Sequence, residues 1–302
     1  MDSEFDLAVS WDWEHDANFV RMLEDHVRRR GLRFYSISHH NTQETIRRIQ
    51  KGDLRFRAFL DRAGDVDETF AAVARALRKT SAILINHPDA LTHANDKATM
   101  HLEFMTAGIH VPFTIIISPY NKKHEIELRL SDLAQLGRPF IIKPANTTGG
   151  GIGVVVGAES LKDIIESRQH HKNDKYLLQE KITPIILGER RAWFRVFWVF
   201  GRPIPCWWDD ETHVYAEADD GEIDIRDLLE LKRITEVIAG VCRLQFFSTE
   251  IAITPERKFV AVDYVNDICD MRLQSRHPDG VPDSTVEEIC AGIAGHLSTA
   301  DS

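Results

Sequence analysis

We expect no segment in this chain that would attach it to a membrane or send it out of the cell. No run among its 302 residues approaches the roughly 20 consecutive apolar residues that a membrane-spanning helix needs. The sequence begins MDSEFD, which is acidic and has no apolar signal region, and this argues against export. We therefore expect a cytoplasmic protein that does not associate with a membrane.

Cysteine pairs and a positive net charge are also missing. The 4 cysteines are scattered and form no C-x-x-C pair, which argues against structural zinc and suits a reducing compartment. The formal net charge of −10 argues against nonspecific nucleic-acid binding, although it leaves room for a local basic pocket. The sequence has no evident internal repeat, and its length allows two or three packed lobes.

Two familiar phosphate-binding motifs are absent, yet one stretch still indicates phosphate binding. Residues 141–156 read IIKPANTTGGGIGVVV: an apolar run that ends in Lys143, a glycine-rich loop and a second β-branched run. This is neither G-x-x-x-x-G-K-[ST] nor G-x-G-x-x-G, and it predicts strand, loop and strand. Glycine lets backbone N–H groups approach a ligand closely, and Lys143 adds a positive charge beside them. A flexible hairpin turn is the alternative interpretation.

The first part of the chain alternates between predicted strands and helices. Strands are expected at 5–10, 32–37, 54–61 and 83–86, with helices at 16–30, 42–51 and 67–79 between them. This β-α-β order predicts a parallel sheet. The loop WDWEHD at 11–16 follows the first strand, where open α/β sheets bind ligands, so it is a candidate substrate site. The alternative is a helix N-cap at Asp16 beside two packed tryptophans.

The middle of the chain predicts a small mixed lobe. We expect a helix from Lys97 through Met105, a strand at 109–117, short helices at 131–136 and after Ser160, and a strand at 176–180. Lys97 is unusual at the start of a helix because the helix dipole disfavours a cation there. A bound phosphate would resolve the conflict, and a solvated surface lysine is the alternative.

The last part predicts a long strand at 190–200, a turn, a strand at 203–208, and helices at 226–240 and 284–297, the last with the capping box STVE. Arg195 interrupts an apolar face of the long strand. A half-buried arginine needs an anionic partner, which could be a substrate group or a structural carboxylate.

Two further strands, at 246–253 and 259–265, form a predicted hairpin with acidic residues. If Glu256 and Arg257 form a two-residue turn, Glu250 and Asp263 lie directly opposite one another. Two opposed carboxylates repel and destabilise a sheet, and a divalent cation would remove that repulsion. Oxygen ligands suit Mg²⁺, and Asn266 or Asp267 could complete the site. The alternative is that one carboxyl is protonated or paired with an arginine.

In this order, the glycine loop, the two lysines and the acidic hairpin resemble the ATP-grasp superfamily over about residues 5–271. The similarity is greatest to carboxylate–amine ligases such as D-alanine–D-alanine ligase, glutathione synthetase and ribosomal-protein glutamate ligases. The run NDK at 95–97 and the run AGIHVP at 107–112 are similar to the family's D-K…A-G-[IV]-x-[VT]-P. The resemblance implies an α/β fold with α+β lobes at 1–96, 97–180 and 181–302, with ATP between the central lid lobe and the C-terminal lobe.

The resemblance also implies roles for matching residues. Lys97 and Lys143 would contact the ATP phosphates, and Arg195 would join Lys143 in catalysis by holding the γ-phosphate and the reacting carboxylate. The implied lid residues are Thr148, Gly149, Gly150, Gly151 and Gly153. Those implied to meet adenine and ribose are Gln179, Glu180, Lys181, Ile182 and Glu189. Those implied to hold Mg²⁺, or Mn²⁺ in its place, are Glu250, Asp263 and Asn266.

One departure from the family concerns the third metal ligand. The family's strand usually ends Glu-x-Asn, whereas Asp263-Tyr264-Val265-Asn266 is one residue longer. Either the strand bends there, or Asp267 replaces Asn266.

The function that the resemblance implies is an ATP-dependent ligase that joins a small-molecule or peptide carboxylate to an amine and releases ADP and phosphate. A homodimer is the family-level expectation. The alternatives are a small-molecule kinase, against which the acidic loop at 11–16 speaks, and a non-catalytic nucleotide-binding module, against which both lysines and Arg195 speak. Neither substrate is named by the sequence. The candidate substrate contacts are Trp11, Trp13, His15, Arg272 and Arg276.

Overall fold

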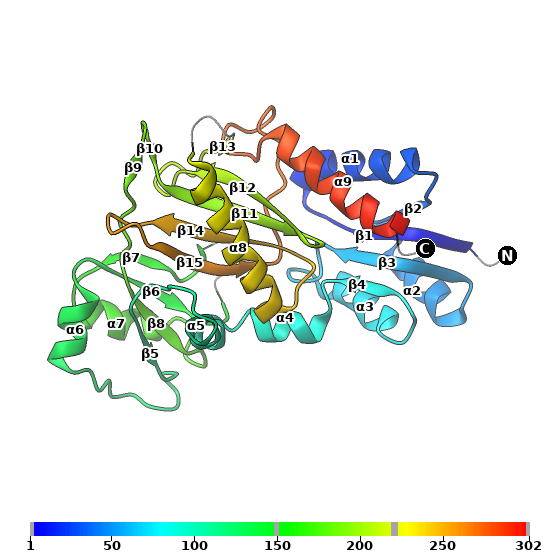
Figure 1. Cartoon of the computed structure of the whole chain (residues 1–302). Coiled ribbons are helices and arrows are strands. Elements are labelled where there is room, and N and C mark those ends of the chain that lie inside the picture. The colour runs from blue at the N-terminus through cyan, green and yellow to red at the C-terminus, as the bar shows by residue number, and fades with distance from the viewer. Residues whose placement is uncertain (1–2, 148–150, 219–222, 300–302) are drawn as a thin grey trace.

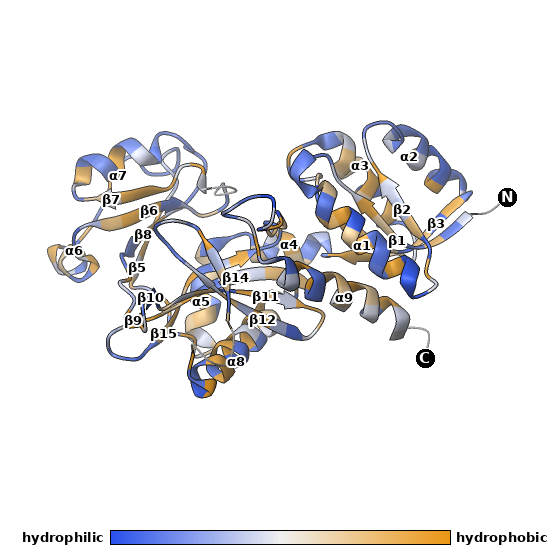
Figure 2. Ribbon diagram, turned by 90° about the horizontal axis from the view of Figure 1, so that it is seen from above, coloured by the Kyte–Doolittle hydropathy of each residue, from blue (hydrophilic) through white to orange (hydrophobic). Residues whose placement is uncertain are grey.

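The computed structural model describes residues 3–147, 151–218 and 223–299, which form three larger sheets and one two-stranded pair (Figure 1). The five-stranded sheet lies between the other two larger sheets (Figure 2). Within this described part, no helix combines the length and apolar character needed to cross a membrane.

The N-terminal sheet is parallel and has the strand order β2-β1-β3-β4, so the predicted β-α-β start is confirmed. Its strands are β1 (Ser3–Ser10), β2 (Phe34–Ile37), β3 (Leu54–Asp61) and β4 (Ile83–Ile85). Its helices are η1 (Glu14–Asp16), α1 (Ala17–Arg29), α2 (Thr42–Lys51) and α3 (Glu68–Leu77). Helices cover both faces, which explains why Leu7, Ala8 and Val9 are all buried.

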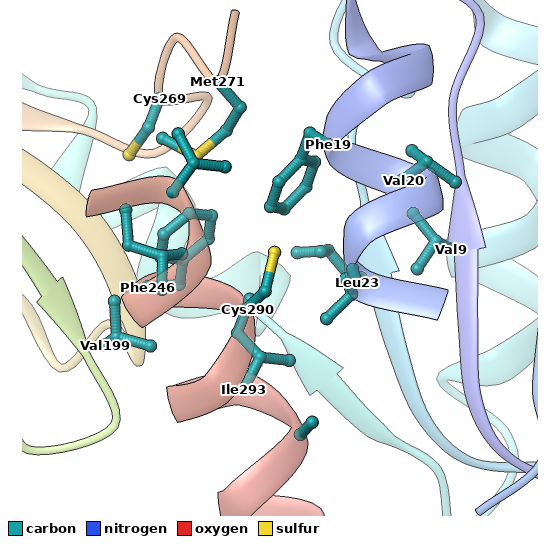
Figure 3. Close-up of a cluster of buried hydrophobic side chains, with 14 of the residues drawn as sticks. Val9, Phe19, Val20, Leu23, Val199, Phe246, Cys269, Met271, Cys290 and Ile293 are labelled. Atoms are coloured by element: carbon teal, nitrogen blue, oxygen red, sulfur yellow. The ribbon is translucent and has the colours of Figure 1, made fainter. Parts of the chain in front are cut away.

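The C-terminal helix α9 (Asp283–Thr299) packs against α1 and returns the end of the chain to the N-terminal sheet. Figure 3 shows Phe19 and Leu23 of α1 beside Cys290 and Ile293 of α9. The same cluster includes Val199 and Phe246 from the five-stranded sheet. Apolar packing therefore joins the first and last parts of the sequence.

The central sheet is antiparallel and has the order β5-β8-β6-β7. Its strands are β5 (Thr114–Ile117), β6 (Phe140–Pro144), β7 (Val155–Ala158) and β8 (Tyr176–Glu180). The helices of this part are α4 (Pro88–Ala94), α5 (Lys97–Thr106), α6 (Leu130–Leu136) and α7 (Leu161–Arg168). The predicted strand at 109–117 is wrong over its first half, where Pro112 has no N–H to donate to a ladder.

The five-stranded sheet is antiparallel and has the order β13-β12-β11-β14-β15. Its strands are β11 (Trp193–Val199), β12 (Arg202–Trp208), β13 (Tyr215–Glu217), β14 (Phe246–Ile253) and β15 (Phe259–Asn266). A small hairpin of β9 (Ile186–Leu187) and β10 (Arg190–Arg191) precedes it, so the predicted strand at 190–200 is split at Ala192. Helix α8 (Ile225–Cys242) packs on one face against Phe194 and Ile251.

Candidate functional site

The hairpin of β14 and β15 pairs Glu250 directly with Asp263, as predicted, but the predicted turn is wrong. The N–H of Thr254 donates to the carbonyl of Lys258 at 2.9 Å, and Arg257 has φ 60°. These features define a three-residue loop with a left-handed last residue. That turn pairs Ile251 with Ala261 and, if continued, would bring Val262 rather than Asp263 opposite Glu250.

Two irregularities in β15 correct the register. One lies between the pair Ile251–Ala261 and the pair Glu250–Asp263. The other lies between the pair Glu250–Asp263 and the pair Ser248–Asn266. Bulges beside functional sites commonly redirect a side chain in this way. Because paired residues share a face, Glu250, Asp263 and Asn266 lie on the same side of the sheet. The extra residue before Asn266 is thus absorbed by the irregular strand, which favours Asn266 over Asp267 as the predicted third ligand.

Three cations from other elements meet these two carboxylates. Arg195 of β11 donates to Oε1 of Glu250. The Nζ atoms of Lys97 and Lys143 lie 3.6 and 3.9 Å from Oδ1 of Asp263. We call these five residues the charged cluster. Its cations offset the repulsion between the opposed carboxylates, so the arginine-paired alternative describes the observed geometry and a metal ion is not required to explain the pairing.

The charged cluster shifts the pKa values of its members. Burial, reinforced by Lys97 and opposed by Asp263, lowers the pKa of Lys143 to about 8. Burial alone would raise the pKa of Asp263, but the nearby Lys97 and Lys143 outweigh it and lower the pKa. Burial would lower the pKa of Arg195, but Glu250 raises it overall. Three cations face two carboxylates, so the cluster carries excess positive charge.

Lys97 owes its position to the start of α5. The carboxylate of Asp96 caps this helix by accepting from the N–H of Ala98 at 3.0 Å, which supplies the negative charge that a helix N-terminus favours. The side chain of Lys97 is only 12% exposed because it turns toward Asp263. The alternative of a solvated surface lysine is therefore wrong.

Lys143 of β6 connects the central sheet to the bulge. Its Nζ donates to the carbonyl oxygen of Val262 at 3.2 Å and lies 5.2 Å from the centre of the Tyr264 ring. Val262 has no cross-strand partner in the register of β14 and β15, so its carbonyl is available for this contact.

A neutral hydrogen-bonded chain lies beside Lys143 of the charged cluster. The hydroxyl of Tyr264 accepts from Nε2 of Gln179 at 2.9 Å and lies 2.6 Å from Nδ1 of His101. Gln179 is 1% exposed and also donates to Oγ1 of Thr114 at 3.2 Å. Burial, with a contribution from Lys143, lowers the pKa of His101 to about 4. Neither His101 nor Tyr264 is marked by a motif in the sequence, since both occupy buried positions on the apolar faces of their elements.

The other predicted nucleotide contacts are more dispersed. Glu180 accepts from the N–H of Phe113 at 2.7 Å, at the end of β8. Lys181 and Glu189 are exposed and Ile182 is half-buried, and within the described residues no recorded contact joins them to the charged cluster. Gly151 and Gly153 have φ values of 77° and 75°. The predicted lid residues that lie outside the described ranges are Thr148, Gly149 and Gly150.

The candidate substrate residues partly contact one another. The rings of His15 and His277 are 4.8 Å apart, and the guanidinium of Arg272 lies 5.9 Å from the Trp13 ring. Arg272 also binds Asp270 and Asp279, at 2.7 and 2.9 Å. Arg276 is exposed, and Trp11 donates to Ser36 at 2.8 Å.

Asp16 occupies the N-cap position of α1 but makes no capping hydrogen bond with its side chain. Its carboxylate instead pairs with Arg62. The alternative interpretation of Asp16 as an N-cap therefore holds for its position but is wrong for its side chain, which does not cap the helix.

The residues predicted to bind Mg²⁺ fit that ion by their chemistry. Glu250, Asp263 and Asn266 offer only oxygen ligands from one face, and Mg²⁺ prefers such ligands while keeping waters and phosphate oxygens. Two buried atoms on the same face, Nε of Arg195 and Oγ of Ser248, have no hydrogen-bond partner in the described structure. Residues 3–147, 151–218 and 223–299 contain no group of three or more His, Cys, Asp or Glu placed to hold a metal. A metal ion at this face would therefore need further oxygen ligands besides the two carboxylates, such as Asn266, waters and phosphate oxygens.

Comparison with known proteins identifies the fold. No profile of a known protein family matches the chain, and no curated protein matches its sequence. A structure of D-alanine–D-alanine ligase from Bacillus anthracis with ATP is similar, with a TM-score of 0.64, 12% identity, and 99% of each chain covered. An ATP-grasp RimK domain protein from Sphaerobacter thermophilus has a TM-score of 0.63 and 18% identity, with 96% of this chain and 98% of that one covered.

A third similar structure is the ATP-grasp ligase PsnB in complex with a minimal precursor, Mg and ADP. It has a TM-score of 0.62 and 16% identity, with 96% of each chain covered. At such low identity the likeness establishes the fold alone. The chain therefore has the ATP-grasp fold, as its sequence predicted.

Proposed function

We propose that this protein is an ATP-dependent carboxylate–amine ligase that forms an amide or peptide bond through an acyl phosphate. The observation that carries the proposal is the charged cluster. It combines excess positive charge with two carboxylates on one hairpin face. Its three cations come from α5, β6 and β11, and its two carboxylates come from the hairpin. An arrangement of this kind suits a polyphosphate accompanied by a divalent cation.

In the first step, an oxygen of the substrate carboxylate attacks the γ-phosphorus of ATP and the bond to the ADP oxygen breaks. Lys97 and Lys143 would hold the phosphate oxygens, and Arg195 would hold the γ-phosphate beside the carboxylate. Glu250, Asp263 and Asn266 would hold Mg²⁺, which offsets phosphate charge when it is bound.

In the second step, an amine nitrogen attacks the acyl carbon and loses a proton, and the bond between the acyl carbon and the phosphate oxygen breaks, so that inorganic phosphate leaves with that oxygen and the electron pair. Arg195 and the N–H groups of the glycine loop would stabilise the oxyanion that forms. Excluding water from the site would protect the acyl phosphate from hydrolysis. Peptides belong among the candidate substrates because PsnB was also solved with the precursor peptide PsnA2.

The proposal is tested by incubating the protein with Mg²⁺-ATP and a pool of amino acids, small carboxylic acids and peptides. We expect ADP and phosphate to form only when an acid and an amine are both present. Glu250→Gln should lower turnover by at least about 100-fold, because it removes a carboxylate that would hold Mg²⁺ and that pairs with Arg195. Glu256→Gln, an exposed change on the same hairpin, is the matched control and should retain activity.

Two outcomes would contradict the ligase. A stable phosphorylated product with ADP, and no dependence on an amine, would identify a kinase. ATP binding without turnover, across the whole pool, would favour the non-catalytic nucleotide-binding module.

A further inference from the structure

The glycine loop is anchored at its base by a segment that the proposed mechanism does not use. Asp174 lies between α7 and β8 and is 8% exposed. Its carboxylate accepts three hydrogen bonds: from the N–H of Asn146 at 2.9 Å, from Nδ2 of Asn146 at 2.8 Å, and from Oγ1 of Thr147 at 2.8 Å. Hydrogen bonds to a charged acceptor are stronger than neutral ones, so this carboxylate fixes the first residues of the loop.

The next residue, Lys175, reaches the helix that carries Lys97. Its Nζ lies 2.5 Å from Oδ2 of Asp96, the residue that caps α5. Its carbonyl oxygen accepts from the N–H of Ala145 at 2.9 Å, and the carbonyl of Ala145 accepts from the N–H of Lys97 at 3.0 Å. The start of α5 and the base of the loop are thereby held to each other on both sides of Ala145.

The described residues at the other side of the loop approach the same segment. Gly153 has φ +75°, and a Cβ built on it would lie 3.1 Å from Pro144 and 3.2 Å from His171. A side chain there would therefore require both strained backbone and movement of its neighbours. The described residues before the loop thus contact Asp174, and Gly153 after the loop approaches His171 and also Pro144 of β6, the strand that leads into the loop.

We propose that Asp174 and Lys175 are positioning residues that place Asn146 and Thr147, at the base of the glycine loop, and Lys97 for phosphate binding; this inference rests on the proposed function. Asp174 acts through Asn146 and Thr147, and Lys175 acts through Asp96 and the first turn of α5. Neither side chain has a recorded contact with the charged cluster among the described residues, so each acts through the groups it holds. Small displacements of binding groups weaken binding and catalysis steeply.

The test measures the Kd for Mg²⁺-ATP by titration calorimetry and the KM and kcat for ATP in Asp174→Asn and Lys175→Met. We expect about a tenfold or greater rise in Kd and KM, with a smaller change in kcat. Lys175→Arg should restore Kd, because an arginine can still bind Asp96. Lys172→Met is the matched control, since Lys172 is an exposed lysine three residues before Lys175, and it should bind ATP as the wild type does.

A double-mutant cycle separates positioning from a general loss of structure. If Lys175 acts through Lys97, Lys175→Met should add no further rise in Kd when Lys97 is already methionine. Additive losses in the cycle, or variants that bind ATP normally, would overturn the inference and leave the proposed function intact. A wild-type protein that does not bind Mg²⁺-ATP would overturn both. If Asp174→Asn fails to fold, the Lys175 series decides the outcome.

Discussion

Two buried charged groups in this protein differ in how completely they are balanced. In the N-terminal part, Arg62 forms two hydrogen bonds with Asp16, at 2.8 and 2.7 Å, and a third with the carbonyl of Cys269 at 2.9 Å. Both side chains are 1% exposed. In the charged cluster, three cations share two carboxylates, and the side chain of Asp263 is 35% exposed.

The contrast separates a structural ion pair from a site prepared for a ligand. A single cation bound in bidentate fashion by a single carboxylate leaves little net field to attract anything else. The charged cluster includes one more cation than carboxylate, and burial lowers the pKa of Lys143, so its ammonium is less stable there than in water. Such local instability is a common accompaniment of function.

The largest effect that we expect in this comparison comes from Asp16→Ala. It leaves the guanidinium of Arg62 buried without its carboxylate, and breaking a buried pair in this way costs about 3–5 kcal/mol in the free energy of unfolding. Urea denaturation measures the change. The control is Glu230→Ala, which breaks the exposed pair with Arg233 and should cost less than about 1 kcal/mol. Equal losses in the two variants would show that burial of the Arg62 pair is unimportant.

An effect of opposite sign is expected for Lys143→Met. The lowered pKa of Lys143 means that its buried ammonium is less stable in the folded protein than in the unfolded chain. Replacing it with an apolar side chain of similar length should raise the free energy of unfolding by about 1–3 kcal/mol at pH 7, because Lys97 and Arg195 still face the two carboxylates, while weakening ATP binding by more than about tenfold. The same denaturation experiment, with a calorimetric ATP titration, checks both results. A destabilised Lys143→Met would remove the distinction between the two charged groups.

The smallest expected effect is a change in the titration of His101, whose pKa is lowered mainly by burial and further by Lys143 of the cluster. Its pKa is lowered from 6.5 to about 4, so stability should fall as the pH drops from about 6.5 to about 4, because the unfolded chain binds the proton and the folded protein does not. Lys143→Met should raise the pKa of His101 in an NMR titration of the imidazole. Asp16→Ala should leave that pKa unchanged, and a wild-type His101 that titrates near 6.5 would contradict the prediction.

Local patterns predicted most of the elements, since they depend on neighbours in the sequence. Alternating strands and helices up to Ile85, and the capping at Ser160, follow from periodicity and short-range hydrogen bonds. The sequence did not indicate α4 or β13, which are short and lack a strong period. The opposition of Glu250 and Asp263 was predicted correctly from the wrong turn, because the irregularity at Val262 compensated for a shift of register.

The sequence by itself determined which chemical groups are available: two lysines, an arginine and two carboxylates beside a glycine loop, in the order typical of the ATP-grasp fold. Only the tertiary structure decided that Lys97, Lys143 and Arg195 meet the same hairpin, and that Arg62 takes Asp16 away from the helix cap. It also decided that Asp174 and Lys175 hold the loop and α5 together. The physical reason is that the sequence sets local conformation, whereas the partners of a buried charge are chosen among groups far apart in the chain by packing and strand register.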